Sequence, residues 1–146
     1  MINSVRSIIL LLAFLVSGIL CGQTLIVEIN PIGQVPVGGA FTVSGTVSHD
    51  PASPTIPAGT SVDISIQVAD PSGNPVFLTP PIQDFAGFNA GRALPFAQTF
   101  TMPWTEDEKW SAGANWVASV TAASSVSSIV RDNEPFALLI ADLQIL

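Results

Sequence analysis

Runs in which apolar and polar residues alternate limit the possible folds of this chain more than any other feature. In the clearest run, 61–69, the apolar side chains are Val62, Ile64, Ile66 and Val68, and the residues between them are Asp63, Ser65 and Gln67. Successive side chains of a β-strand point to opposite faces, so this alternation predicts a strand with one buried side. Similar runs recur between clusters of Pro, Gly, Asn, Asp and Ser, which predicts an all-β antiparallel sandwich.

Other segments repeat the pattern. At 41–48 the residues Phe41, Val43, Gly45 and Val47 share one face, and Pro36-Val37-Gly38-Gly39 supplies the turn that precedes them. A second turn is predicted at Asp70–Pro75, between the 61–69 strand and a short strand at 76–78. The other predicted strands are 25–30, 96–102, 116–122, 126–132 and 136–146, for a total of about seven or eight. One short helical turn is expected near 105–112, because Thr105 and Glu108 have capping-box spacing.

The first 22 residues have the form of a secretory signal peptide. A start with the single base Arg6 is followed by a continuous apolar run and then by small residues up to Gly22. Residues 23–146 are therefore expected to form a single domain that is secreted, extracellular or at the cell surface, with the periplasm as an alternative. A lipid anchor at Cys21 is disfavoured, because the bulky Leu20 stands where bacterial lipidation signals have a small residue.

Charge and cysteine content narrow the classes of partner. The formal net charge of the chain is -7, and without Arg6 its strong bases are Arg92, Lys109 and Arg131. A nucleic acid partner is not expected, because binding phosphates requires a basic patch. No transmembrane segment is predicted in the mature chain. Cleavage after Cys21 would leave no cysteine, so the domain must be stabilised by packing rather than by disulfides.

The segments Val35–Val47 and Val68–Val76 resemble bacterial immunoglobulin-like domains, and Trp116–Ala122 is similar to their penultimate strand. The resemblance covers most of the mature chain and implies an immunoglobulin-like sandwich with a scaffold, adhesion or assembly role. It carries no shared catalytic residues, and the paired cysteines of antibody domains are missing here.

No enzyme motif is present in the sequence. It contains no Gly-x-Ser-x-Gly elbow, no His-Glu-x-x-His pair and no phosphate-binding loop, and its single histidine is His49. We therefore expect no catalytic residues and no cofactor. The acids Glu106, Asp107 and Glu108 could join Asp84 or Asp132 around a calcium ion, but a helix start explains the three adjacent acids more simply, and no metal site is predicted.

Two features suggest contact with other molecules. Trp104 and Trp110 could form an exposed aromatic surface for sugar or protein, although packing against the sandwich is the favoured interpretation, and Trp116 is assigned to the core. The 136–146 segment is apolar on both faces, through Phe136, Leu138, Leu139, Ile140, Leu143, Ile145 and Leu146. Either the domain's own loops cover this strand, or it pairs with a neighbouring subunit by β-augmentation.

The sequence thus predicts a non-catalytic exported module. We expect it to be a structural protein that contacts other proteins, with self-assembly into a homo-oligomer, an extracellular filament or a surface layer as the leading hypothesis. An adhesive or carbohydrate-binding domain is the alternative. An assembling protein would be large in solution, whereas a ligand-binding module would stay monomeric and be stabilised by its ligand.

Overall fold

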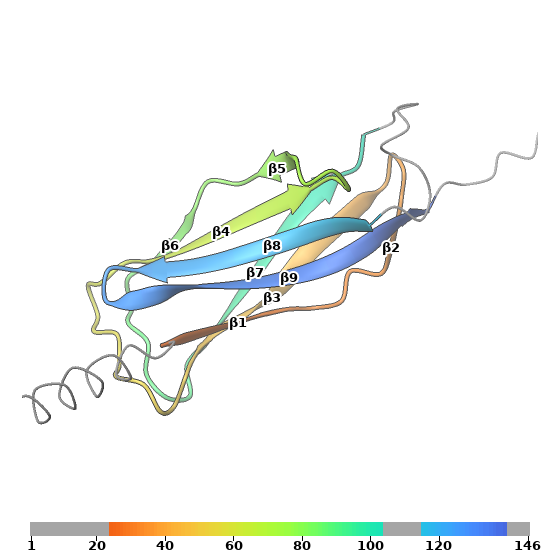
Figure 1. The fold of residues 1–146 in the computed structure, drawn as a ribbon. Coiled ribbons are helices and arrows are strands. Elements are labelled where there is room, and N and C mark those ends of the chain that lie inside the picture. Colours follow the sequence, from red (N-terminus) through yellow and green to blue (C-terminus); the bar gives the residue numbers. More distant parts are fainter. Residues whose placement is uncertain (1–23, 104–114, 140–146) are drawn as a thin grey trace, which may run out of the picture.

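The computed structural model describes residues 24–103 and 115–139, which form an all-β sandwich of two sheets (Figure 1). The strands in these ranges are β1 (Leu25–Ile29), β2 (Gln34–Pro36), β3 (Ala40–His49), β4 (Val62–Ala69), β5 (Pro75–Leu78), β6 (Ile82–Asp84), β7 (Ala93–Thr101), β8 (Asn115–Ser124) and β9 (Ser127–Leu139). The predicted fold class is confirmed.

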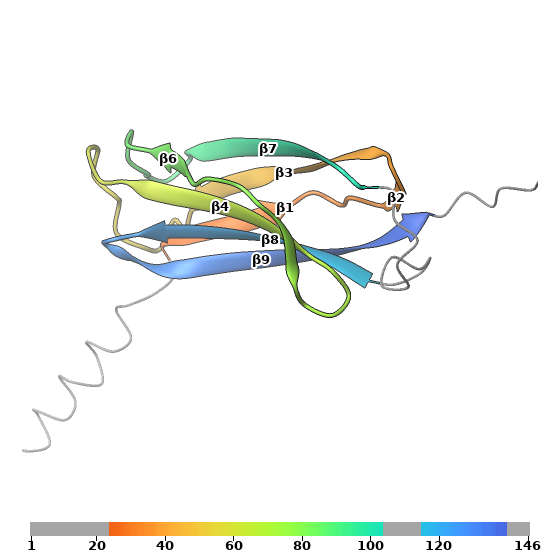
Figure 2. The same cartoon turned by 90° about the horizontal axis from the view of Figure 1, so that it is seen from above.

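The smaller sheet has the order β1-β3-β7, and both of its pairings are antiparallel. The larger sheet has the order β2-β9-β8-β4-β5, with β6 pairing along the same side of β4 as β5 does. Its pairings are antiparallel except that of β2 with β9. The two sheets lie face to face, as the view from above in Figure 2 shows.

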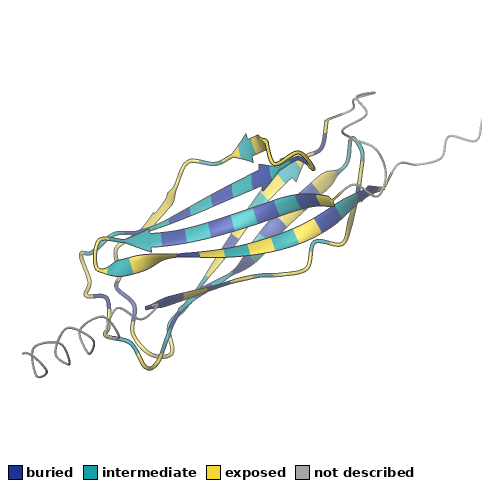
Figure 3. Cartoon of the chain, viewed as in Figure 1, coloured by how far each residue is buried: buried dark blue, intermediate teal, exposed yellow. Residues whose placement is uncertain are grey.

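Alternating side chains fill the space between the sheets. The four apolar side chains of the 61–69 run are all buried in β4, and the side chains between them are partly exposed (Figure 3). In β3, Phe41, Val43 and Val47 are buried on one face, as predicted. Trp116 in β8 is fully buried, which confirms its assignment to the core. Burial at about 25 cal/mol per Å² of apolar surface is the main driving force of such a fold.

The predicted turn at Asp70–Pro75 is also confirmed. The buried carboxylate of Asp70 accepts hydrogen bonds from the backbone N–H groups of Ser72 and Asn74, both at 2.9 Å. Gly73 has a φ of 85°, a conformation that glycine adopts without steric cost. Asp70 and Gly73 thus close the hairpin between β4 and β5.

Two details of the predicted strand pattern were wrong. The strands predicted at 126–132 and 136–146 are not separated by a loop, because β9 runs without a break from Ser127 to Leu139. β9 has no strand on its outer edge until Ala137 pairs with β2, so the missing N–H of Pro135 costs no ladder bond there and the strand continues through it. The short strands β2 and β6 were not predicted. The helical turn predicted near 105–112 lies outside the described residues.

Candidate functional site

The edges of the two sheets are the places where this fold can pair with another chain. In the described ranges, β1 and β7 bound the smaller sheet, and β2 with β9, and β5 with β6, bound the larger one. An edge strand carries a row of unpaired N–H and C=O groups that another strand can join. Proteins normally block such rows with charges, prolines, short strands or cover from a neighbouring segment.

The edge formed by β9 and β1 is blocked in several of these ways. β9 carries Arg131, Asp132 and Glu134, followed by Pro135. An oxygen of the Asp132 carboxylate accepts a hydrogen bond from the backbone N–H of Ile29 at 2.9 Å, which links β9 to β1 across the two sheets. A strand that approached this side would have to break the link and bury charged groups.

The opposite edge of the larger sheet consists of short strands and prolines. β5 has four residues and begins with Pro75, and β6 has three residues. Pro80 and Pro81 lie between them and have no N–H groups to offer. Because no long row of donors is present, this edge is also poorly suited to pairing.

By contrast, β7 is a long edge strand without charges. Its nine residues, Ala93–Thr101, include no acid or base, and Pro95 is the only proline among them. It pairs with β3 on one side and ends the sheet on the other, and Figure 2 shows it as the outermost strand of its sheet. Among the edges in the described residues, β7 is the least protected.

The register of β7 fixes which of its backbone groups face outward. The N–H of Met102 donates to the carbonyl of Gly39 at 2.9 Å, just beyond the pair Ala40–Thr101. Hydrogen-bonded and non-hydrogen-bonded pairs alternate along an antiparallel ladder. Thr101, Thr99 and Ala97 therefore occupy non-hydrogen-bonded positions, and their N–H and C=O groups point away from β3. Pro95 falls in the same series, where its missing N–H costs no bond to β3.

A second hydrogen bond supports this assignment. Ser44, the β3 partner of Ala97, uses its carbonyl to accept the N–H of Asn30 at 2.8 Å on the β1 side. A residue of a regular strand directs its N–H and C=O to the same side, so Ser44 does not bond to Ala97. The free edge thus presents a row of donors and acceptors from Ala97 to Thr101.

The predicted assembly segment is divided by the boundary of the described residues. Phe136 and Leu138 are buried in this domain's own core, where Phe136 pairs with Trp116 of β8 and Leu138 with Val35 of β2. Leu139 is 47% exposed. The other predicted assembly residues, Ile140, Leu143, Ile145 and Leu146, lie outside the described residues, as do the aromatic candidates Trp104 and Trp110.

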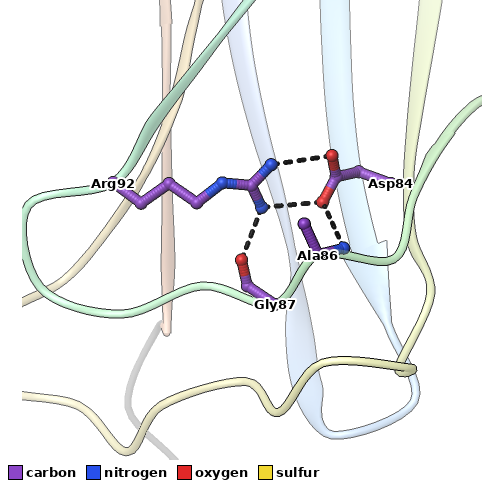
Figure 4. A network of polar contacts seen from close by, with 4 residues as sticks. All are labelled: Asp84, Ala86, Gly87 and Arg92. Atoms are coloured by element: carbon purple, nitrogen blue, oxygen red, sulfur yellow. Dashed lines mark hydrogen bonds and ion pairs between the residues drawn. The ribbon is translucent and has the colours of Figure 1, made fainter.

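The loop between β6 and β7 is organised by one arginine (Figure 4). The Arg92 guanidinium contacts the Asp84 carboxylate through two hydrogen bonds, of 2.7 and 2.8 Å, and also donates to the carbonyl of Gly87. Its central carbon lies 4.4 Å from the centre of the Phe88 ring, a cation–π geometry. The hydrogen bonds from Arg92 lower the pKa of Asp84. This network holds the loop that leads into β7.

The same loop borders a small open hollow lined by residues 55–58 and 86–89. Backbone hydrogen bonds between Ile56 and Phe88 join its two walls, at 2.8 and 2.9 Å. None of the lining residues is charged.

Among the described residues, those considered for metal binding or catalysis each have other partners. His49 is buried, and its Nε2 lies 2.9 Å from the carbonyl oxygen of Pro54. Asp84 is paired with Arg92 and Asp132 accepts from Ile29, while 106–108 lie outside the described residues. Within residues 24–103 and 115–139, no cluster of three or more His, Cys, Asp or Glu side chains could hold a metal ion. In the same ranges no helix is long and apolar enough to cross a membrane.

Comparison with known proteins identifies the fold but not a family. The sequence matches no protein-family model, and no curated protein is significantly similar to it. Among solved structures, the CARDB domain of the PF1109 protein from Pyrococcus furiosus, in complex with di-metal ions, has a TM-score of 0.50 and 14% identity, over 80% of this chain and 87% of that one.

Two further similar structures belong to enzymes. Superoxide reductase (neelaredoxin) from Ignicoccus hospitalis has a TM-score of 0.43 and 13% identity, over 80% of this chain and 81% of that one. A calcium-binding mutant of Bacteroides uniformis β-glucuronidase 2 has a TM-score of 0.47 and 14% identity, over 78% of this chain but only 13% of the enzyme. At such identities the likeness shows only a β-sandwich similar to CARDB and immunoglobulin-like domains.

Sequence reasoning identified β7 as a strand but not as an interaction edge. Its alternation looks like that of β3, which lies in the middle of the same sheet. The absence of charge from 93 to 101 was visible in the sequence and is the one signal that could have singled it out.

Proposed function

We propose that the protein is a non-catalytic exported structural module that self-assembles by β-strand addition. The observation that carries the proposal is the open edge of β7, where the N–H and C=O groups of Ala97, Thr99 and Thr101 face away from the sheet. Strand addition to such an edge gains main-chain hydrogen bonds along its whole length.

The contrast between β7 and the other edges supports self-assembly over accidental exposure. Charges and the Asp132–Ile29 link protect one side of the larger sheet, and prolines protect the other. Natural sandwiches usually protect every edge in this way. An edge left long and uncharged is therefore best explained by a partner strand that occupies it in the working protein.

The experiment that tests this function is sedimentation velocity of the protein purified from cells that express the full chain, over a wide range of concentration. Negative-stain electron microscopy of the same samples shows the form of any assembly. We expect the average mass to increase with concentration and filaments or regular oligomers to appear. Single particles of one-domain size at every concentration would contradict the proposal.

A further inference from the structure

The smaller sheet is narrower than the sheet that it covers. Its strand β1 lies against β9 and β8, so the order β1-β3-β7 reaches only as far as β4, and β5 and β6 extend beyond it. The ring of Phe77 in β5 packs on Phe100 of β7, with 5.1 Å between ring centres, at this boundary. One more strand beside β7 would lie beneath β5 and β6.

An incompletely covered apolar residue marks the place of that strand. Ile82 in β6 pairs with Ile64 in β4, and paired residues point to the same face of a sheet. Ile64 is fully buried, but Ile82 is 39% exposed. Phe77 shares this face, since it pairs with the buried Val68, and it too is only partly buried. The inner face of the larger sheet therefore has an apolar margin next to the free edge of β7.

A single strand fits this margin better than a second whole domain. A copy that joined antiparallel through its own β7 would bring its larger sheet to the same side, where β5 and β6 already project. An extended segment has no second layer, so it can pair with β7 on one side and cover Ile82 with its inward side chains.

We propose that residues 140–146 of a neighbouring copy add to β7 as this strand. The inference rests on the proposed self-assembly. Its two contact elements are the free edge of β7 in one copy and residues 140–146 of the next. In the segment, Ala141, Leu143 and Ile145 would share one face, and the other face would carry Asp142 and Gln144 between Ile140 and Leu146. The first face, which is wholly apolar, meets Ile82 and Phe77, and the second face, with Asp142 and Gln144 at its centre, lies beside the exposed residues Ala97, Thr99 and Thr101.

Residues 140–146 cannot form this contact with the β7 edge of their own domain. Leu139 ends β9 beside Val37, whose N–H donates to its carbonyl at 3.2 Å, on the side of the sandwich away from β7. Crossing three strand spacings of about 4.8 Å would consume at least four residues at about 3.3 Å each. Too few of residues 140–146 would remain to pair along the edge of their own domain.

The first test removes one outward donor from β7. Thr99→Pro deletes an N–H that does not bond to β3, together with the hydrogen bond between the hydroxyls of Thr99 and Thr42 at 2.9 Å. The control is Asn133→Pro on the outer edge of β9, which deletes one cross-strand side-chain bond, from Ser119 at 2.7 Å, and the hydrogen bond from the N–H of Asn133 to the Asp132 carboxylate at 2.9 Å. We expect Thr99→Pro to weaken association about tenfold and Asn133→Pro to leave it unchanged.

The second test keeps the ladder intact and maps the contact. Thr99→Cys chains are mixed with chains that carry a cysteine at 142, 143 or 144, and disulfide-linked pairs of unlike chains are measured after mild oxidation. Residues two apart share a face of a strand, so cysteines at 142 and 144 should link to position 99 and one at 143 should not. If Thr99→Pro fails to fold, this test still shows whether residues 140–146 pair with β7.

The outcomes separate the inference from the function on which it rests. Association that is equally strong in wild type, Thr99→Pro and Asn133→Pro would overturn the β7 contact but leave self-assembly standing. Linking without the alternating pattern would overturn the role of residues 140–146. A wild-type chain that never associates would overturn both.

Discussion

Adding a single methyl group at Gly45 should be among the most damaging substitutions in the smaller sheet. Gly45 lies on the inner face of β3, opposite Ile29 of β1 and Phe96 of β7. A Cβ at this position would overlap the backbone carbonyl oxygen of Glu28 and would lie 2.7 Å from Cζ of Phe96. Carbon and carbonyl oxygen normally approach no closer than about 3.3 Å, so β1 must move about 1 Å or more.

The size of the destabilisation follows from the contacts that this movement of β1 would break. The N–H of Asn30 and the carbonyl of Ser44 are 2.8 Å apart, and a shift of this size exceeds hydrogen-bond range. Losing about two such bonds at about 1 kcal/mol each, and displacing the buried Phe96 ring at about 1–3 kcal/mol, gives about 3–5 kcal/mol for Gly45→Ala. The melting temperature should fall by about 10–20 °C.

Thermal unfolding followed by circular dichroism measures this effect, and Thr46→Ala is the control. Thr46 is the next residue along β3 and points to the other face, so its truncation should cost about 1 kcal/mol or less. Adding Phe96→Leu to Gly45→Ala should not restore stability, because the tighter overlap is with backbone. If Gly45→Ala melts within a few degrees of wild type, the inferred close approach of β1 and β3 is wrong.

Three further outcomes follow from the structure. Arg92→Ala should lower the free energy of unfolding by about 1–3 kcal/mol, because it removes the two hydrogen bonds to Asp84 and the contact with Phe88. Chemical denaturation measures this loss, and a loss no larger than that of Arg131→Ala would count against the prediction. Asp84→Asn should lower the free energy of unfolding at neutral pH, whereas in strong acid the variant and the wild type should be equally stable. The reason is that Arg92 lowers the folded-state pKa of Asp84, so its stabilisation is present above the ordinary value of 3.8 and is lost as the pH falls through the lowered value; a deficit that persists in acid would argue against the ion pair. Phe136→Ala should lower the free energy of unfolding by about 3–5 kcal/mol because that ring is buried, whereas Leu139→Ala should lower it by less than about 1 kcal/mol. Equal melting temperatures for the two variants would contradict the assignment of Phe136 to the domain's own core.

The local sequence pattern was sufficient to predict the fold class and most of the strands. The burial of alternate residues in β4 follows from the period of two of an extended chain, and it needs no knowledge of the partners. The turn at Asp70–Gly73 was equally readable, because side chain and backbone within a few residues determine it. The continuity of β9 through Pro135 was not readable, since a proline is tolerated in a strand only where the outer side has no partner.

Only the tertiary structure determines which strand forms the candidate interaction edge. The sequence predicted an export signal, a sandwich and an assembly strand at 136–146, and it placed Trp116 in the core. Which strands end a sheet depends on pairings between residues far apart in the chain, such as Ala40 with Thr101, and no local pattern encodes these. Side-chain alternation sets which residues are buried, whereas the order of strands decides that the backbone of β7 has no neighbour on its outer side.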